Sequence, residues 1–221
     1  MAQKYLNFME ILMAHRHLSS ITNGIGTLGA VLAVALGTTD AKAQAPSAEI
    51  QIAQAVLAGP AGQRAGAKVV GFRDDGTTLT LREGSNSLIC LANNPTQEAW
   101  SVACYADSID PYMSRGRELR ENGVTDSQEV TQRRWDEADA GTLAMPEAPA
   151  TVYIMHGEGY DAEAGEIIAP FLRWAIYTPW ATTESTGLPQ QPTGPSAPWI
   201  MFAGTPGAHI MITPAPPGGG N

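Results

Sequence analysis

Residues 88–105 read LICLANNPTQEAWSVACY and hold both cysteines of the 221-residue chain. Cys90 lies in the apolar run 88–91, and Cys104 lies in the run 100–105, after a polar segment that contains a proline. Short apolar runs bounded by turn residues are typical of β-strands. We therefore expect two strands here, and a disulfide between the cysteines would join them.

Residues 13–45 indicate the cellular compartment in which the cysteines are located. A short polar front precedes an apolar run at residues 25–36, and Ala41-Lys42-Ala43 matches the small-x-small pattern of a cleavage site. The run is shorter than the roughly 20 residues that cross a bilayer. These features predict a signal peptide over residues 1–43 and a periplasmic or secreted protein.

An oxidising compartment makes a disulfide between Cys90 and Cys104 the default prediction. Closing a loop of this size stabilises a fold by about 3 kcal/mol through the entropy of the unfolded chain. Two free thiols and a two-thiol metal site are the alternatives, although the spacing is far wider than the CxxC pattern of a zinc knuckle.

The rest of the chain suffices for a single exported domain, which we place at residues 44–213, before a disordered tail at residues 214–221. The formal net charge is −9, and removing the leader takes away one more positive than negative charge. An acidic protein is poorly matched to the phosphates of nucleic acid or to an anionic lipid surface. We expect no nucleic-acid binding and no stable membrane insertion after leader cleavage.

The first half of the exported chain contains helix and hairpin signals. Residues 46–58 place apolar residues at helical spacing and stop at Gly59-Pro60. Residues 68–72 and 77–81 flank Asp74-Asp75-Gly76, which is a turn pattern between two strand-like runs. We expect a short N-terminal helix followed by a β-hairpin.

Two further helix signals follow in mid-chain. Asp110-Pro111 begins the first helix, which we expect over residues 112–121. Thr125 and Gln128 predict a capping box for a second helix that extends to about Asp139 and has little apolar content.

The second half of the chain is extended in character. Apolar, aromatic and β-branched runs predict strands at residues 151–155, 167–178, 199–203 and 209–213. Residues 185–198, rich in proline and glycine, predict a long ordered loop or a mobile flap. The expected fold class is α+β: a β-rich single domain with a short N-terminal helix, one or two mid-chain helices and a disulfide.

Two histidines, His156 and His209, adjoin strand-like runs in the exported part. If those strands pair, both imidazoles face one site, where Glu158 or Asp161 completes a metal shell or orients a general base. This arrangement predicts an exported hydrolase or metal-dependent enzyme. The alternative is a histidine at a strand end that hydrogen-bonds to its own surroundings.

Arginines gather at Arg115, Arg117 and Arg120. Guanidinium groups that converge near a helix start bind carboxylate or phosphate groups. A structural network with nearby carboxylates, such as those of Asp110 and Glu118, explains the same cluster without a ligand.

Four aromatic residues, Trp174, Tyr177, Trp180 and Trp199, flank the proline-rich segment. Aromatic side chains on exposed loops form flat binding surfaces, and they also close small cores beneath long loops. The sequence supports both interpretations.

Motifs with a settled chemistry do not occur in the exported sequence. It contains no Gly-x-Ser-x-Gly elbow, no phosphate-binding glycine loop and no dinucleotide fingerprint. We expect no cofactor, and the balance favours a protein that is not an enzyme.

Short motifs are spread over most of the exported chain: Gly84 to Cys90, Cys104, Arg115 to Arg120, Gly187-Leu188-Pro189, Pro198-Trp199-Ile200-Met201, and Gly207-Ala208-His209-Ile210-Met211-Ile212. Together they resemble a family of uncharacterised exported bacterial proteins. The resemblance implies an exported bacterial protein and assigns no activity.

Three functional hypotheses follow. The leading one is a domain that binds a small molecule or an envelope partner without catalysis, through the proline-rich segment, its aromatic residues and His209. Arg115, Arg117, His156 and Trp199 are further candidate binding residues. The second hypothesis is the enzyme based on His156 and His209, and the third is a structural envelope protein.

Overall fold

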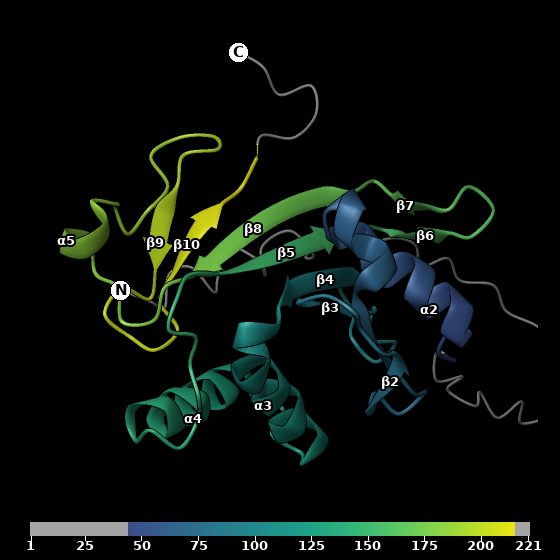
Figure 1. The fold of residues 1–221 in the computed structure, drawn as a ribbon, viewed down its shortest axis with the longest axis horizontal. Helices are drawn as coiled ribbons and strands as arrows, with labels where there is room; N and C mark the ends of the chain where they lie inside the picture. Colours follow the sequence, from purple (N-terminus) through teal and green to yellow (C-terminus); the bar gives the residue numbers. More distant parts are fainter. Residues whose placement is uncertain (1–43, 215–221) are drawn as a thin grey trace, which may run out of the picture. The chain divides into compact units, whose positions relative to one another are not determined.

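One eight-stranded sheet, in the order β2-β1-β3-β4-β5-β8-β10-β9, organises the computed structural model (Figure 1). The structure describes residues 44–214; the predicted signal peptide and nearly all of the predicted tail lie outside them. Neighbouring strands are antiparallel except β1 and β3, which are parallel. The strands are β1 Lys68–Phe72, β2 Thr78–Arg82, β3 Leu88–Leu91, β4 Ser101–Ala106, β5 Ala150–His156, β8 Phe171–Tyr177, β9 Trp199–Met201 and β10 His209–Ile212.

The two expected cysteine strands are confirmed, and they are neighbours. Cys90 on β3 lies directly opposite Cys104 on β4. The two Sγ atoms are 2.09 Å apart, at disulfide-bonding distance, and both residues are fully buried. We call this side of the sheet the disulfide face.

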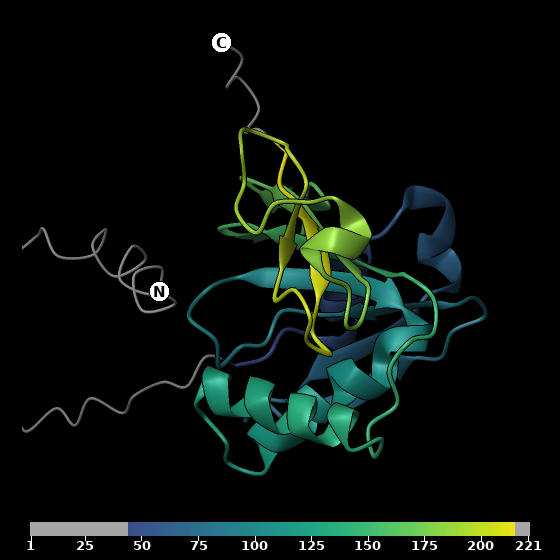
Figure 2. The ribbon, with the colours of Figure 1, turned by 90° about the vertical axis from the view of Figure 1, so that its left-hand side faces the viewer.

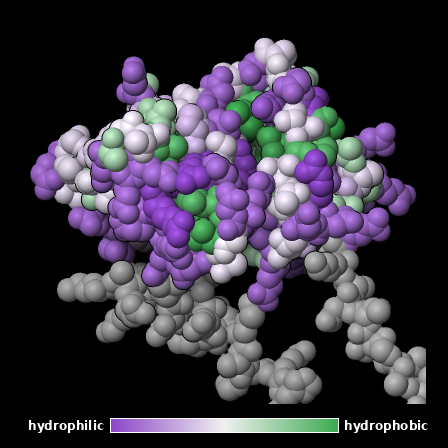
Figure 3. Space-filling model, turned by 90° about the horizontal axis from the view of Figure 1, so that it is seen from below, coloured by the Kyte–Doolittle hydropathy of each residue, from purple (hydrophilic) through white to green (hydrophobic). Residues whose placement is uncertain are grey.

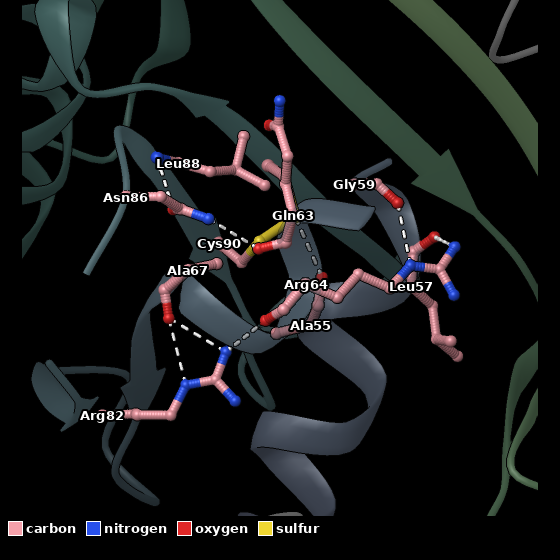
Figure 4. The surroundings of a disulfide bond; sticks show 11 residues. Ala55, Leu57, Gly59, Gln63, Arg64, Ala67, Arg82, Asn86, Leu88 and Cys90 are labelled. Atoms are coloured by element: carbon pink, nitrogen blue, oxygen red, sulfur yellow. Dashed lines mark hydrogen bonds between the residues drawn. A yellow bond between two sulfur atoms is a disulfide. The ribbon is translucent and has the colours of Figure 1, made fainter. Parts of the chain in front are cut away.

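Helix α2 (Ala48–Ala55) and the 3-10 turns η2 (Val56–Ala58) and η3 (Ala61–Gly66) cover the disulfide (Figure 4). The chain passes so close that a Cβ atom at Gly59 would lie 2.9 Å from Leu88 Cδ2 and 3.1 Å from Cys104 Sγ. Such a distance is shorter than real Cβ contacts. Glycine therefore avoids crowding where the chain crosses the disulfide.

A buried glutamine attaches α2 to the sheet. The Gln51 amide donates to the Phe72 carbonyl (3.0 Å) and accepts from the Phe72 N–H (2.8 Å). Strand β3 follows β1 only as far as Val70. The Gln51 side chain thus supplies partners for backbone groups of β1 beyond the end of the β3 pairing, which a buried strand needs.

The opposite side of the sheet, which we call the helical face, is covered by α3 (Asp110–Glu121) and α4 (Ser127–Asp139). Figures 1 and 2 show these helices on one side of the sheet and α2 on the other. A short turn, η4 (Asp107–Ile109), leads into α3, and Ile109 and Tyr112 pack against Tyr105 and Val152. Asp126 caps α4 by accepting from the Glu129 N–H at 2.7 Å, so the predicted Thr125 and Gln128 capping box is wrong by one residue.

The expected strand at residues 167–178 is divided in two. Strand β7 (Glu166–Ile168) pairs with β6 (Gly159–Asp161) in a separate hairpin, and β8 begins at Phe171. Ala169 adopts a positive φ of 49°, and Pro170 has no N–H for a ladder bond. The two residues end one strand and turn the chain into the next.

The proline-rich segment is largely without regular structure, as expected. A single turn of helix, α5 (Thr183–Thr186), begins with a capping box between Thr182 and Ser185, and β9 begins only at Trp199. No helix within residues 44–214 is long and apolar enough to cross a membrane. The observed fold is the predicted α+β, sheet-rich domain with a short N-terminal helix, two mid-chain helices and a buried cysteine pair.

Candidate functional site

The register of the sheet separates the two histidines. His156 pairs with Phe171 at one end of β8, and His209 pairs with Tyr177 at the other end. A strand rises about 3.3 Å per residue, so the two positions lie about 20 Å apart. Within residues 44–214 no group of three histidine, cysteine or acidic side chains is placed to hold a metal ion.

The acidic residues expected beside the histidines lie in the β6–β7 hairpin region. Glu158 is exposed, and its N–H donates to the Ile168 carbonyl at 2.9 Å. The Asp161 carboxylate accepts from the N–H groups of Glu163 and Ala164, which fixes the hairpin turn. Both residues have local structural roles here.

Two of the candidate arginines belong to an ion-pair network between elements. Arg115 on α3 binds Glu137 on α4 through three contacts of 2.6 to 3.1 Å and also pairs with Glu118 at 2.9 Å. Arg117 donates to the Tyr105 hydroxyl at 2.9 Å and to Asp110 at 3.2 Å. The network interpretation of this cluster is therefore the one that the geometry favours.

His209 lies in an aromatic cluster on the helical face. Its ring stacks on Tyr177 with centroids 4.8 Å apart and meets the edge of Phe202 at 5.7 Å. Nδ1 is 2.8 Å from the Gly207 carbonyl oxygen and must donate to it, because a carbonyl only accepts. Burial lowers the pKa of the imidazole, so His209 is neutral with the lone pair on Nε2.

Helix α4 closes the same cluster from the side. The Trp135 indole lies 5.2 Å from the Phe202 ring, edge to face, and its N–H donates to the Tyr112 hydroxyl at 3.2 Å. A Cβ atom at Gly207 would overlap Trp135 Nε1. Close packing thus holds the β9–β10 turn against α3 and α4.

At the edge of this cluster, two large aromatic side chains face solvent. Trp180 is 44% exposed and Phe202 is 46% exposed. Both residues have a backbone φ of 57°, in the left-handed region that bulky side chains avoid at a cost of roughly 1 to 2 kcal/mol each. Hydrogen bonds from the Trp180 N–H to Thr205 and from the Gly204 N–H to Ala181 hold the two turns together.

Both exposed rings contact the same turn of α4. Phe202 packs on Trp135, and the Trp180 indole N–H donates to the Asp139 carboxylate at 2.9 Å. Residues four apart on a helix lie on one face, so the two rings contact adjacent positions on the same face of α4. We call Trp180, Phe202 and the hollow beside Trp180 the aromatic surface.

The hollow has a volume of about 290 Å³. Thr178 contributes to its wall, and the Thr178 hydroxyl oxygen is buried without a hydrogen-bond partner among the described residues. Buried polar atoms without a partner are rare in folded proteins. The other lining residues are Pro146, Glu147, Ala148, Pro149, Pro179 and Trp180.

The aromatic residues expected from the sequence do not form one surface. Trp199, on the edge strand β9, lies opposite Met211 and packs partly against the core of the helical face. Trp174 lies opposite Tyr153, on the disulfide face. Sequence reasoning missed Phe202, because only its backbone conformation and its contact with α4 place it at the site.

A second, larger cleft of about 600 Å³ opens on the helical face beside the C-terminal part of α3. Ser101 and Ala103 on β4 line it, together with Arg117, Arg120 and Glu121 on α3. Seen from this side, the surface is mostly hydrophilic, with hydrophobic side chains in limited patches (Figure 3).

The chain matches no family model, no curated protein and no solved structure. The assignment of a site therefore rests on the geometry described above.

Proposed function

We propose that this domain is an exported binding module without catalytic activity, which binds a cationic segment of a partner protein on the aromatic surface. The observation that carries the proposal is the conformation of Trp180 and Phe202. Both are exposed aromatic residues at positive φ, where glycine would be free of strain. Strain of this kind persists where the side chain is needed, and exposed rings are suited to contact with a partner.

The charge around the two rings favours a cationic partner. Asp139 holds the Trp180 indole, and Glu147 lines the adjoining hollow. A lysine or arginine that lies over an indole ring gains about 0.5 to 2 kcal/mol, and a nearby carboxylate adds to this attraction. The net charge of −9 attracts the same class of partner over a longer range.

The shape of the surface favours an extended segment. The hollow beside Trp180 is small and lined by three prolines, and Phe202 lies outside it on the neighbouring turn. Grooves lined by aromatic and proline side chains suit extended, proline-containing peptides. Export is supported by the leader-like sequence and by the cysteine pair at disulfide-bonding distance.

The enzyme hypothesis needed His156 and His209 in one site, and the register separates them. His209 is surrounded by Tyr177, Phe202 and a carbonyl, and its Nε2 makes no hydrogen bond with described residues. His209 therefore packs against Phe202 and supports that ring.

A fluorescence titration with two defined peptides tests the proposal. The probes are acetylated, amidated pentapeptides that alternate proline with arginine or proline with glutamate. The exported protein should bind the arginine peptide and not the glutamate peptide, and W180A or D139N should abolish this binding. I168A is the matched control, because Ile168 is equally exposed (47%) but belongs to the β6–β7 hairpin. Equal binding of both peptides, or unchanged binding by W180A, would overturn the proposal.

A further inference from the structure

Arg173 on β8 has an unusual set of partners. Its Nη2 lies 2.6 Å from His156 Nε2, and this is the one hydrogen bond of the Arg173 side chain within residues 44–214. Its Nε is buried with no partner there, and no carboxylate of the described chain forms an ion pair with it. A half-buried guanidinium without an anion is costly, because burial penalises the charge and leaves donors unsatisfied.

The contact also fixes the protonation of His156. A guanidinium has only donors, so His156 Nε2 accepts and the ring proton lies on Nδ1. Burial and the charge of Arg173 both lower the pKa of His156. The pair therefore carries a single positive charge and still has unused N–H donors on both residues.

The pair lies beside the 600 Å³ cleft. On the helical face, Ser101 lies opposite His156, Ala103 lies opposite Ile154, and Ile154 lies opposite Arg173. Directly opposed residues share a face of the sheet, and Ser101 and Ala103 line the cleft. Because Arg173 on β8 reaches His156 on β5, its guanidinium lies over β5, the strand next to β4 and its cleft-lining residues.

The residues that line the cleft show which part of this region is suited to an anion. Leu91 and Ala103 give it an apolar floor, and Arg117 is already paired with Asp110. The carboxylates of Asp75 and Glu121 lie at the far end and bind Thr77 and Thr78. The Arg173 and His156 pair lies beside the Ser101 wall of the cleft and is the part of this region suited to an anion, and Ile154, opposite Arg173, adds an apolar side chain next to it.

We infer that the Arg173 and His156 pair binds a small monocarboxylic acid beside this cleft, with the carboxylate on the two side chains and the apolar body along Ile154 toward Ala103 in the cleft wall. The charge of the Arg173 and His156 pair matches one carboxylate rather than a doubly charged phosphate. A guanidinium offers a planar pair of donors that fits carboxylate oxygens. The site lies at the opposite end of β8 from the aromatic surface, so the two proposals stand or fall separately.

The test is an NMR titration of the exported protein with benzoate, with benzamide as the neutral probe of the same shape. Benzoate should bind with saturation and shift the Arg173 Nε–H signal, whereas benzamide should not. R173Q should weaken benzoate binding by about tenfold to a hundredfold, the range expected for loss of a charged hydrogen-bond pair.

Two further variants show whether weaker binding by R173Q reflects loss of the binding group or a folding defect. H156Q keeps a hydrogen-bonding side chain at position 156 and should weaken benzoate binding several-fold in a folded protein. R133Q removes an exposed arginine that pairs only with Glu129 and should leave benzoate binding unchanged. The inference is overturned if wild-type protein shows no saturable binding of benzoate, if benzamide binds equally well, or if folded R173Q and H156Q bind as wild type does.

Discussion

The disulfide region and the aromatic surface use glycine in opposite ways. Over the disulfide, Gly59 has an ordinary φ of −85°, and glycine suits the position because a Cβ atom would lie only 2.9 Å from Leu88 Cδ2 and 3.1 Å from Cys104 Sγ. At the aromatic surface, Trp180 and Phe202 themselves have a positive φ of 57°, although neither is glycine. The first region is shaped by packing, whereas the second keeps side chains that its backbone disfavours.

This difference separates stability from function within one domain. Close packing over the buried cysteines lowers the free energy of the folded state. The positive φ of Trp180 and Phe202 raises it, and this is the observation from which we propose a binding role for the two rings.

Removal of the cysteine pair should have the largest effect. We expect C90A/C104A to lower the free energy of unfolding by about 3 kcal/mol, because the unfolded chain loses its cross-link. Urea unfolding of both proteins gives this value, and reduction with dithiothreitol should reproduce the loss in the wild type only. Loss of peptide binding by the folded variant would contradict the separation of the two regions.

An added methyl group at Gly59, where the chain crosses the disulfide, should destabilise the fold. We expect G59A to be destabilised by about 2 kcal/mol, since overpacking forces neighbours to move. G62A is the matched control, because a Cβ atom there meets nothing within 4 Å. Equal urea midpoints for the two variants would show that Gly59 is not required by packing.

At position 180, a glycine variant should be more stable than an alanine variant, which reverses the usual order of stability. Glycine relieves the positive φ, so W180G should be more stable than W180A by about 1 kcal/mol. At Trp199, in strand β9, the backbone is extended, so W199A should instead be more stable than W199G. If W180A proves more stable than W180G in urea unfolding, the backbone strain is not real.

Protonation of His209 should give the smallest effect. Its folded pKa lies below the unfolded value of about 6.5, so its contribution is complete above that pH and declines as pH falls toward the folded pKa. The slope should be at most about 1.4 kcal/mol per pH unit. Urea unfolding between pH 7.5 and 5.5 should show a weaker pH dependence in H209Q. An unchanged slope would mean that folding does not lower the pKa of His209.

Local patterns predicted much of the fold. The hairpin around Asp74-Asp75-Gly76, the two mid-chain helices and the cysteine strands are all present. The break in the predicted strand 167–178 was missed, although Pro170 within the run was a signal for it. The capping residue of α4 is Asp126, a better N-cap by rank than the predicted Thr125.

The site was less predictable, because it depends on long-range register and on backbone dihedral angles. Nothing local to His156 and His209 specifies that they pair with opposite ends of β8. The positive φ of Trp180 and Phe202 has no sequence signal, since glycine usually supplies it. Arg173 stood inside an apolar run, and its lack of a carboxylate partner appears only when the strands are in place.

The central claim is that Trp180 and Phe202 are kept for binding and not for stability. The most direct test is the double variant W180G/F202G, titrated with the arginine pentapeptide after its urea unfolding has been measured. We predict a folded protein whose stability lies within about 1 kcal/mol of the wild type, because relief of strain offsets lost packing, and no binding of the peptide. A folded double variant that binds the peptide as the wild type does would contradict the account.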